Sequence, residues 1–104
     1  MRDTYSRRLG GPGFIMFNIG DIALALAGRD SGRCFVIVGI SDESYVFIAN
    51  GRSRKADSPK KKKIKHLKLI KKAEEGFVVS LNLKNGKFTN SVLKKIISEY
   101  SGTV

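Results

Sequence analysis

The stretch that decides the fold runs from residue 20 to residue 55 and reads GDIALALAGRDSGRCFVIVGISDESYVFIANGRSRK. In its first part Ile22, Leu24 and Leu26 alternate with alanines, a period of two that indicates a β-strand with its bulky residues on one face. CFVIVGI and YVFIA are short β-branched and aromatic runs that are typical of buried strands. The polar segments GRDSGR and SDES separate these runs and predict turns. The stretch therefore predicts three successive strands joined by short turns.

Two further strands are expected downstream. Asn50-Gly51 is a strong hairpin signal that favours a type I′ turn into a short strand over residues 52–56. IKHLKLI, residues 64–70, alternates again and suits a final strand, with Leu67 and Leu69 pointing the same way. Several short strands at close spacing in a small chain favour a compact barrel over a two-sheet sandwich. We therefore expect a mainly β fold, a small barrel of about five strands.

The C-terminal part of the chain has a helical pattern instead. Thr89 or Asn90 can cap the start of a helix, and Gly102 stands where that helix would end. The preceding segment AEEGFVVSLNLKNG suits either a strand or a short helix, of which we favour the helix. In FTNSVLKKIISEYSG the apolar residues recur at helical spacing and form one stripe, namely Val92, Leu93, Ile96, Ile97 and Tyr100.

The expected organisation has three parts within 104 residues, a length that suits a single core. Residues 1–15 contain the run GGPG and no periodic apolar pattern, so we expect a flexible N-terminal arm or an over-extended start ahead of Met16. Residues 16–72 are expected to form the barrel, with a basic loop over residues 51–65. Residues 73–104 are expected to form a C-terminal helical extension.

Positive charge is concentrated in one segment of the chain. Twenty Lys and Arg against nine Asp and Glu give a net charge of +11, and residues 51–72 hold eleven of the basic residues and one acidic residue, Asp57. Charge localised in this way attracts polyanions. We interpret PKKKKIKHLK, residues 59–68, as a charged connection into the closing strand. Its lysines would face the polyanion while Ile64, Leu67 and Leu69 hold it to the core.

Other chemistries find little support in the sequence. One cysteine, Cys34, and one histidine, His66, provide neither a disulfide within the chain nor a metal-ligand set. We interpret Cys34 as a small hydrophobe at the start of a buried strand, in a reducing, cytoplasmic setting. No apolar run approaches the length of a membrane span, and GRDSG lacks the Gly-Lys-Ser/Thr of a Walker loop. We expect no enzymatic activity, no metal and no cofactor.

Several of these segments also carry a family resemblance. Gly20-Asp21 before a strand, the turn GRDSG and the apolar strand over residues 35–38 resemble a KOW motif. With ANGRSRK and PKKKKIKHL they resemble the small bacterial KOW-domain RNA-binding proteins, which are related to the fourteen-E class of large-subunit ribosomal proteins. The resemblance implies an SH3-like barrel, RNA binding and association with ribosomal RNA. Two features depart from it: Ser31 stands where many KOW turns carry lysine, and no glutamate near Val92 completes a capping box.

The candidate RNA-binding residues are basic side chains and one histidine. Gly28 and Gly32 are expected to shape the KOW turn. Arg29 and Arg33 in that turn offer the paired donors that phosphate prefers, although Asp30 could pair with either arginine instead. The candidate set is Arg29, Arg33, Arg52, Arg54, Lys55, Lys60, Lys61, Lys62, Lys63, Lys65, His66 and Lys68.

Three ring side chains have two interpretations each. His66 is either a polar residue at the barrel edge or a base-stacking and phosphate-donating contact. Tyr45 and Phe47 are either core residues or stacking surfaces for bases. The sequence leaves these alternatives open.

Three functions from different classes follow. The favoured one is an RNA-binding module that clamps structured RNA, expected to be ribosomal RNA of the large subunit, with the barrel as a platform. The alternative is a polybasic adaptor for an anionic membrane surface or an acidic protein, although stable anchoring needs a second signal besides the charge. The third is a permanent structural subunit of the ribosome rather than a visiting factor. The sequence leaves the oligomeric state open.

Overall fold

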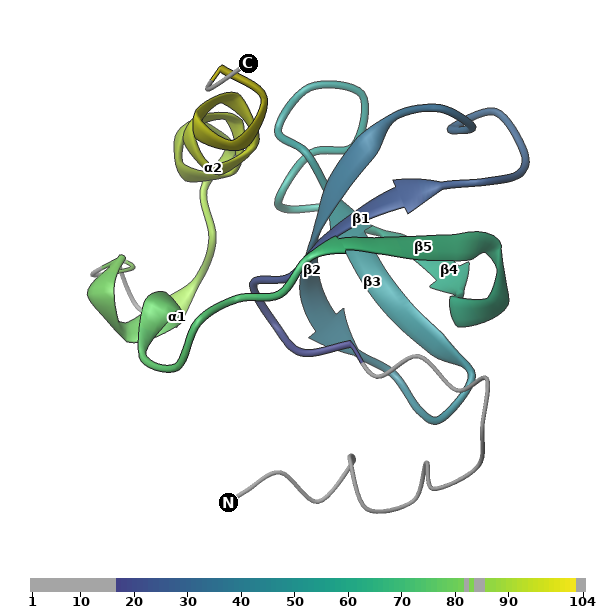
Figure 1. Cartoon of the computed structure of the whole chain (residues 1–104), viewed down its shortest axis with the longest axis horizontal. Coiled ribbons are helices and arrows are strands. Elements are labelled where there is room, and N and C mark those ends of the chain that lie inside the picture. Colours follow the sequence, from purple (N-terminus) through teal and green to yellow (C-terminus); the bar gives the residue numbers. More distant parts are fainter. Residues whose placement is uncertain (1–16, 82, 84–85, 103–104) are drawn as a thin grey trace.

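A computed structural model describes residues 17–81, 83 and 86–102 (Figure 1). The expected N-terminal arm, residues 1–15, lies outside these residues. The elements in chain order are β1 (Ile22–Ala25), β2 (Cys34–Ile40), β3 (Tyr45–Ala49), β4 (Lys60–Lys63), the 3₁₀ turn η2 (Ile64–His66), β5 (Leu67–Lys71), α1 (Phe77–Ser80) and α2 (Asn90–Gly102). The strands form one antiparallel sheet in the order β4-β3-β2-β1-β5. The expected mainly β fold, five strands followed by a C-terminal helix, is confirmed.

One apolar core lies on the inner face of this curved sheet. Phe17 and Phe35 are fully buried there, together with residues of β1, β2, β3 and β5. On β1 the alanines face this core, because Ala23 and Ala25 are buried whereas Leu26 is 52% exposed. Small side chains on β1 leave room for the two phenylalanine rings, as dense packing requires. The alternation in IALALA is therefore real, but the small residues are the ones that point into the core.

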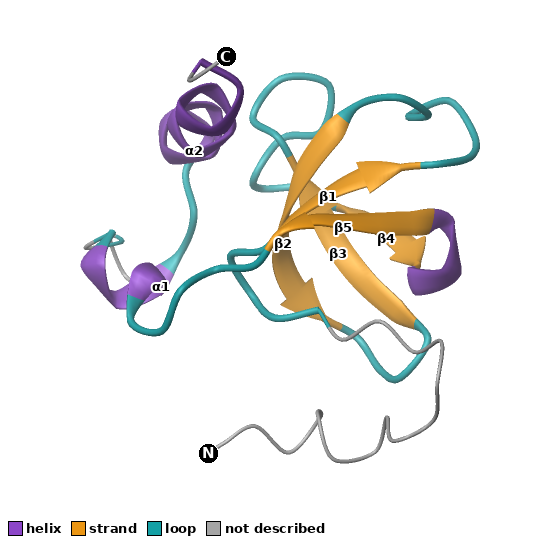
Figure 2. Cartoon of the chain, viewed as in Figure 1, coloured by secondary structure: helices purple, strands orange, loops and turns teal. Residues whose placement is uncertain are grey.

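A second apolar layer joins the outer face of the sheet to the helices, which lie together on one side of it (Figure 2). Ile22 and Val36 of the sheet pack here with Leu93 and Ile96 of α2, and all four are buried. Burial of each such side chain stabilises the fold by about 1.5–3 kcal/mol. The apolar stripe expected for α2 is present except at Tyr100, which is 37% exposed. The short helix expected over part of the ambiguous segment is α1.

The expected strand over residues 52–56 is wrong, because Asn50 organises a loop there instead. Its Oδ1 accepts hydrogen bonds from the backbone N–H groups of Arg52 (2.9 Å) and Arg54 (3.0 Å), and its Nδ2 donates to Ser53 Oγ (3.2 Å). Such side-chain bonds compete with a strand ladder for the same backbone groups. The chain therefore does not fold straight back along β3.

The lysine run itself forms the strand β4, which pairs with β3 on the side away from β2. In β4 the partners run from Tyr45↔Lys63 to Ile48↔Lys60. The expected basic loop over residues 51–65 is thus interrupted by a strand, and the expected closing strand starts only at Leu67 because η2 occupies residues 64–66. As expected, Leu67 is buried in the inner core, with Ile64 and Leu69 packed against it.

Candidate nucleic-acid interface

The turn between β1 and β2 presents two arginines to solvent. Gly28 (φ +80°) and Gly32 (φ +85°) adopt left-handed backbone conformations, which cost a residue with a side chain about 1–2 kcal/mol. Backbone hydrogen bonds from Gly32 N–H to Ala25 O (2.9 Å) and from Arg33 N–H to Asp30 O (3.1 Å) close the turn. Arg29 and Arg33 are both exposed. The two glycines thus supply the backbone conformations that this turn requires.

Asp30 pairs with Arg54, an arrangement that the sequence did not suggest. Arg54 Nε lies 3.2 Å from both carboxylate oxygens of Asp30, and Arg54 Nη2 lies 3.0 Å from Oδ2. The Asp30 side chain is only 6% exposed. This bidentate ion pair joins the 28–32 turn to the 50–54 loop. The turn and the loop lie at the same end of the sheet in Figure 1. It engages Arg54, one of the candidate contacts, within the protein.

Lys62 also points into the protein. It occupies the strand position opposite buried Val46, is itself buried, and its Nζ donates a hydrogen bond to the carbonyl of Ala27 at 2.9 Å. A Cβ placed on Gly28 would lie 3.3 Å from the same Nζ. Lys62 therefore holds the start of the arginine-bearing turn and connects β4 to the segment just after β1.

The neighbouring lysines of β4 face outward with an aromatic ring. Lys61 Nζ lies 5.0 Å and Lys63 Nζ lies 5.9 Å from the centre of the Tyr45 ring, both within cation–π range. Tyr45 and Phe47 are half-buried on this outer face and belong to neither buried core cluster. Phe47 packs closely over Gly39, where an added Cβ would lie 3.3 Å from Phe47 Cδ2.

The remaining candidates are spread over three places. Arg52 and Lys55 are exposed in the loop that follows β3, at the same end as the arginine turn. Lys60 is exposed at the start of β4, and Lys65 and Lys68 are exposed on η2 and β5. His66 is half-buried and its carbonyl accepts a hydrogen bond from Leu26 N–H at 2.9 Å.

The Gly20-Asp21 pair of the motif has a structural role. The Asp21 side chain is fully buried, and its Oδ2 accepts hydrogen bonds from Asn18 N–H (2.7 Å) and from Lys72 Nζ (3.1 Å). Its Oδ1 accepts one from Ala73 N–H (2.7 Å). One carboxylate thus holds the entry to β1 against the end of β5, and it engages a lysine of the basic segment in doing so.

Lys94 is a basic residue near the loop that did not stand out in the sequence. It is exposed on α2, and a Cβ on Gly51 would lie 3.1 Å from its Cγ. The charge count singled out residues 51–72, so nothing in the sequence marked a lysine on a later helix as part of the basic surface. Only the packing of α2 places Lys94 beside the 50–54 loop.

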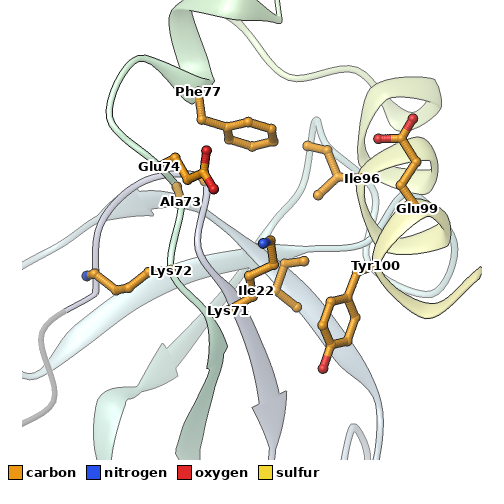
Figure 3. A pocket seen from close by; sticks show the side chains of 10 residues that line it. Ile22, Lys71, Lys72, Ala73, Glu74, Phe77, Ile96, Glu99 and Tyr100 are labelled. Carbon is orange, nitrogen blue, oxygen red and sulfur yellow. The ribbon is translucent and has the colours of Figure 1, made fainter. Parts of the chain in front are cut away.

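A cavity of about 480 Å³ lies elsewhere, between the end of β5 and the two helices (Figure 3). The side chains of Phe77 and Ile96 line it together with those of Lys72, Glu74 and Glu99. Charges of both signs surround an apolar floor, so the cavity does not concentrate anions as the arginine turn does. We assign no chemistry to this cavity.

The described residues include one thiol of low reactivity and no metal-binding cluster. Burial raises the pKa of the Cys34 thiol, which keeps it protonated and poorly nucleophilic. Among residues 17–81, 83 and 86–102, no group of three or more His, Cys, Asp or Glu side chains is placed to hold a metal ion. No helix in this part of the chain is long and apolar enough to cross a membrane.

These features define a small β-domain with a C-terminal helix and exposed basic side chains around one end of its sheet. The chain matches no family model. It is 33% identical over 78 residues to large ribosomal subunit protein eL14 of Desulfurococcus amylolyticus, covering 75% of this chain and 74% of the relative. It is also 37% identical over 54 residues to eL14 of Staphylothermus marinus. That match covers 52% of this chain and 56% of the relative, so the chain spans about half of the length of this second relative. The chain belongs to the eL14 family of large ribosomal subunit proteins.

Proposed function

We propose that this protein is a component of the large ribosomal subunit that binds folded ribosomal RNA through the basic end of its sheet. The observation that carries the proposal is the similarity to eL14, which extends over three quarters of both chains. The names of these relatives place them in the large subunit. A cytoplasmic location and the absence of enzymatic activity follow for this chain from the same proposal.

The proposed interface has two parts, the 28–33 turn and the 50–55 loop. Arg29 and Arg33 are exposed in the first, and Arg52 and Lys55 in the second. The ion pair between Asp30 and Arg54 holds the two parts together, so that four cations are presented by a rigid frame. Guanidinium groups fixed in this way suit the phosphates of a double-helical RNA, whose deep major groove resists reading by side chains.

The finer assignment is to the KOW type of domain. The glycines of the 28–32 turn and the basic loop that is packed against it support this assignment. Residues 16–72 would form the KOW domain and residues 73–104 its helical extension. Both matched relatives are archaeal proteins, so the resemblance to the bacterial branch stays a prediction.

The first experiment is sedimentation of a cell lysate through sucrose gradients at low and high salt, followed by immunodetection of the protein. Co-migration with the large subunit that survives high salt supports a permanent component, whereas release by salt indicates a visiting factor. A protein that stays at the top of the gradient at low salt contradicts the proposal. Anionic vesicles and free RNA would then be the partners to test.

A matched pair of variants tests the interface itself. R29Q/R52Q removes two charges from the proposed surface, while K71Q/K95Q removes two exposed charges elsewhere. We expect the first variant alone to weaken binding to deproteinised large-subunit RNA. Its slope of log K against log salt should become shallower by about 1.4–1.8, since each phosphate contact contributes about 0.7–0.9. Equal losses in both variants would show that only net charge matters.

A further inference from the structure

The start of α2 is locked against the basic loop. Gly51 has φ +78° and lies so close to α2 that an added Cβ would be 2.5 Å from the carbonyl oxygen of Asn90. On the other side of the same loop, Ala56 N–H donates a hydrogen bond to Asn90 Oδ1 at 2.7 Å. The backbone and side chain of one residue thus contact both ends of the segment from Gly51 to Ala56.

This contact sets the position of Lys94. Residues four apart lie on the same face of a helix, so Lys94 follows Asn90 on the side of α2 that meets the loop. The side chain of Lys94 is exposed, and its Cγ would lie 3.1 Å from a Cβ on Gly51. The next residue in the chain to Gly51 is exposed Arg52. A lysine of the helix therefore lies beside Gly51, the residue that precedes exposed Arg52 in the loop.

Three contacts in succession join this point to the arginine turn. Asp30 connects the turn to Arg54, Asn50 connects Arg54 to the start of the loop, and Gly51 connects the loop to Asn90. Figure 2 shows the same order in space, with α2, the loop after β3 and the turn after β1 along one end of the molecule. From Asn90 to Ile97 α2 contains no acidic residue that would oppose the positive charge.

We propose that α2 forms the third part of the RNA-binding surface and that Lys94 binds a backbone phosphate of the same RNA as Arg29 and Arg52. This inference rests on the proposed function and extends it. The helix then has two roles: its apolar face covers the sheet through Leu93 and Ile96, and its flank lengthens the phosphate-binding surface beyond the loop.

The test compares K94Q with K95Q. Both lysines are exposed, but Lys95 lies about 100° further around the helix, away from Gly51. Binding is measured by fluorescence anisotropy across a KCl series, with deproteinised large-subunit RNA and a plain RNA hairpin as probes. We expect K94Q to lower affinity about five- to eightfold at 0.1 M salt, with a slope shallower by about 0.7–0.9, and K95Q to change affinity less than about twofold.

An equal effect of K94Q and K95Q would overturn the role of Lys94. R29Q/R52Q, measured in parallel, separates this failure from failure of the proposed function. If R29Q/R52Q weakens binding and K94Q does not, α2 is not part of the surface. If neither changes binding, or if the unaltered protein does not bind RNA, the proposed function itself is wrong. Thermal unfolding of each variant verifies that the fold is intact.

Discussion

At the scale of single residues, four consecutive lysines have two different roles. Alternation along β4 turns Lys61 and Lys63 toward Tyr45 on the outer face and turns Lys62 toward the protein, where it binds the carbonyl of Ala27. The charge run is therefore not a uniform surface. A buried lysine that binds a backbone carbonyl holds the chain in place, whereas an exposed lysine is available to a phosphate.

Substitution by methionine separates these roles. K62M keeps the length of the side chain but removes the donor to Ala27 O, so we expect a loss of about 1–2 kcal/mol in the free energy of unfolding. K61M should leave stability within about 0.5 kcal/mol, because Lys61 is exposed on the outer face of β4. Urea unfolding of the two variants measures the difference. A variant K62M as stable as the unaltered protein would contradict the structural role of Lys62.

Two glycines with the same backbone conformation offer a second test. Gly32 and Gly51 both have positive φ, but an added Cβ meets nothing within 4 Å at Gly32 and the Asn90 carbonyl at 2.5 Å at Gly51. G32A should therefore cost only the conformational strain, about 1–2 kcal/mol. G51A should cost clearly more, because α2 must move. Equal costs, measured by thermal or urea unfolding, would show that the contact between loop and helix is not rigid.

At the scale of elements, the sequence predicted β2 and β3 with their correct bounds, because each is a continuous apolar run between polar turns. It misplaced β4, because four lysines do not look like a strand and Asn50-Gly51 looks like a tight hairpin. The side chain of Asn50 binds the backbone of Arg52 and Arg54, and this local choice delays the strand to Lys60. Periodicity detects apolar faces but not such competition between side chains and the backbone.

The attachment of α2 to the sheet can be tested at its centre. Leu93 is fully buried between α2 and the outer face of the sheet, so L93A should lower the free energy of unfolding by about 2–4 kcal/mol. Val79 of α1 is 81% exposed, and V79A serves as the control, with an expected change within about 0.5 kcal/mol. If L93A changed stability no more than V79A, the second apolar layer would contribute little to the fold.

At the scale of the whole molecule, the candidate site was predictable in sign but not in arrangement. Counting charges placed the basic segment at residues 51–72, yet Arg54 is engaged by Asp30, Lys62 by Ala27 and Lys72 by Asp21. The partners of these cations lie in the segment that follows β1, which contains Ala27 and Asp30, and at Asp21 immediately before β1. Only the folded sheet brings such distant residues together, so composition overestimates the charge that is available to a ligand.

The available charge sets the expected binding behaviour. If the five exposed cations of the proposed surface each neutralise one phosphate, log K should fall against log salt with a slope of about −3.5 to −4.5, largely independent of RNA sequence. A titration of a plain RNA hairpin and an unrelated duplex over a KCl series measures both properties. A slope shallower than about −2, or a strong preference for one of the duplexes, would require a binding surface other than the one described.

The contact between Gly51 and Asn90 also has a consequence for biosynthesis. The strands of the described sheet all precede α2 in the chain, so their residues are synthesised before the helix that covers Ile22 and Val36. During that interval the outer apolar face has no cover, and exposed apolar surface of this kind favours aggregation. The loop from Gly51 to Ala56 likewise receives its last hydrogen-bond partner only when Asn90 emerges. We therefore expect the contacts of the arginine turn to be able to form earlier in synthesis than those between the loop and α2.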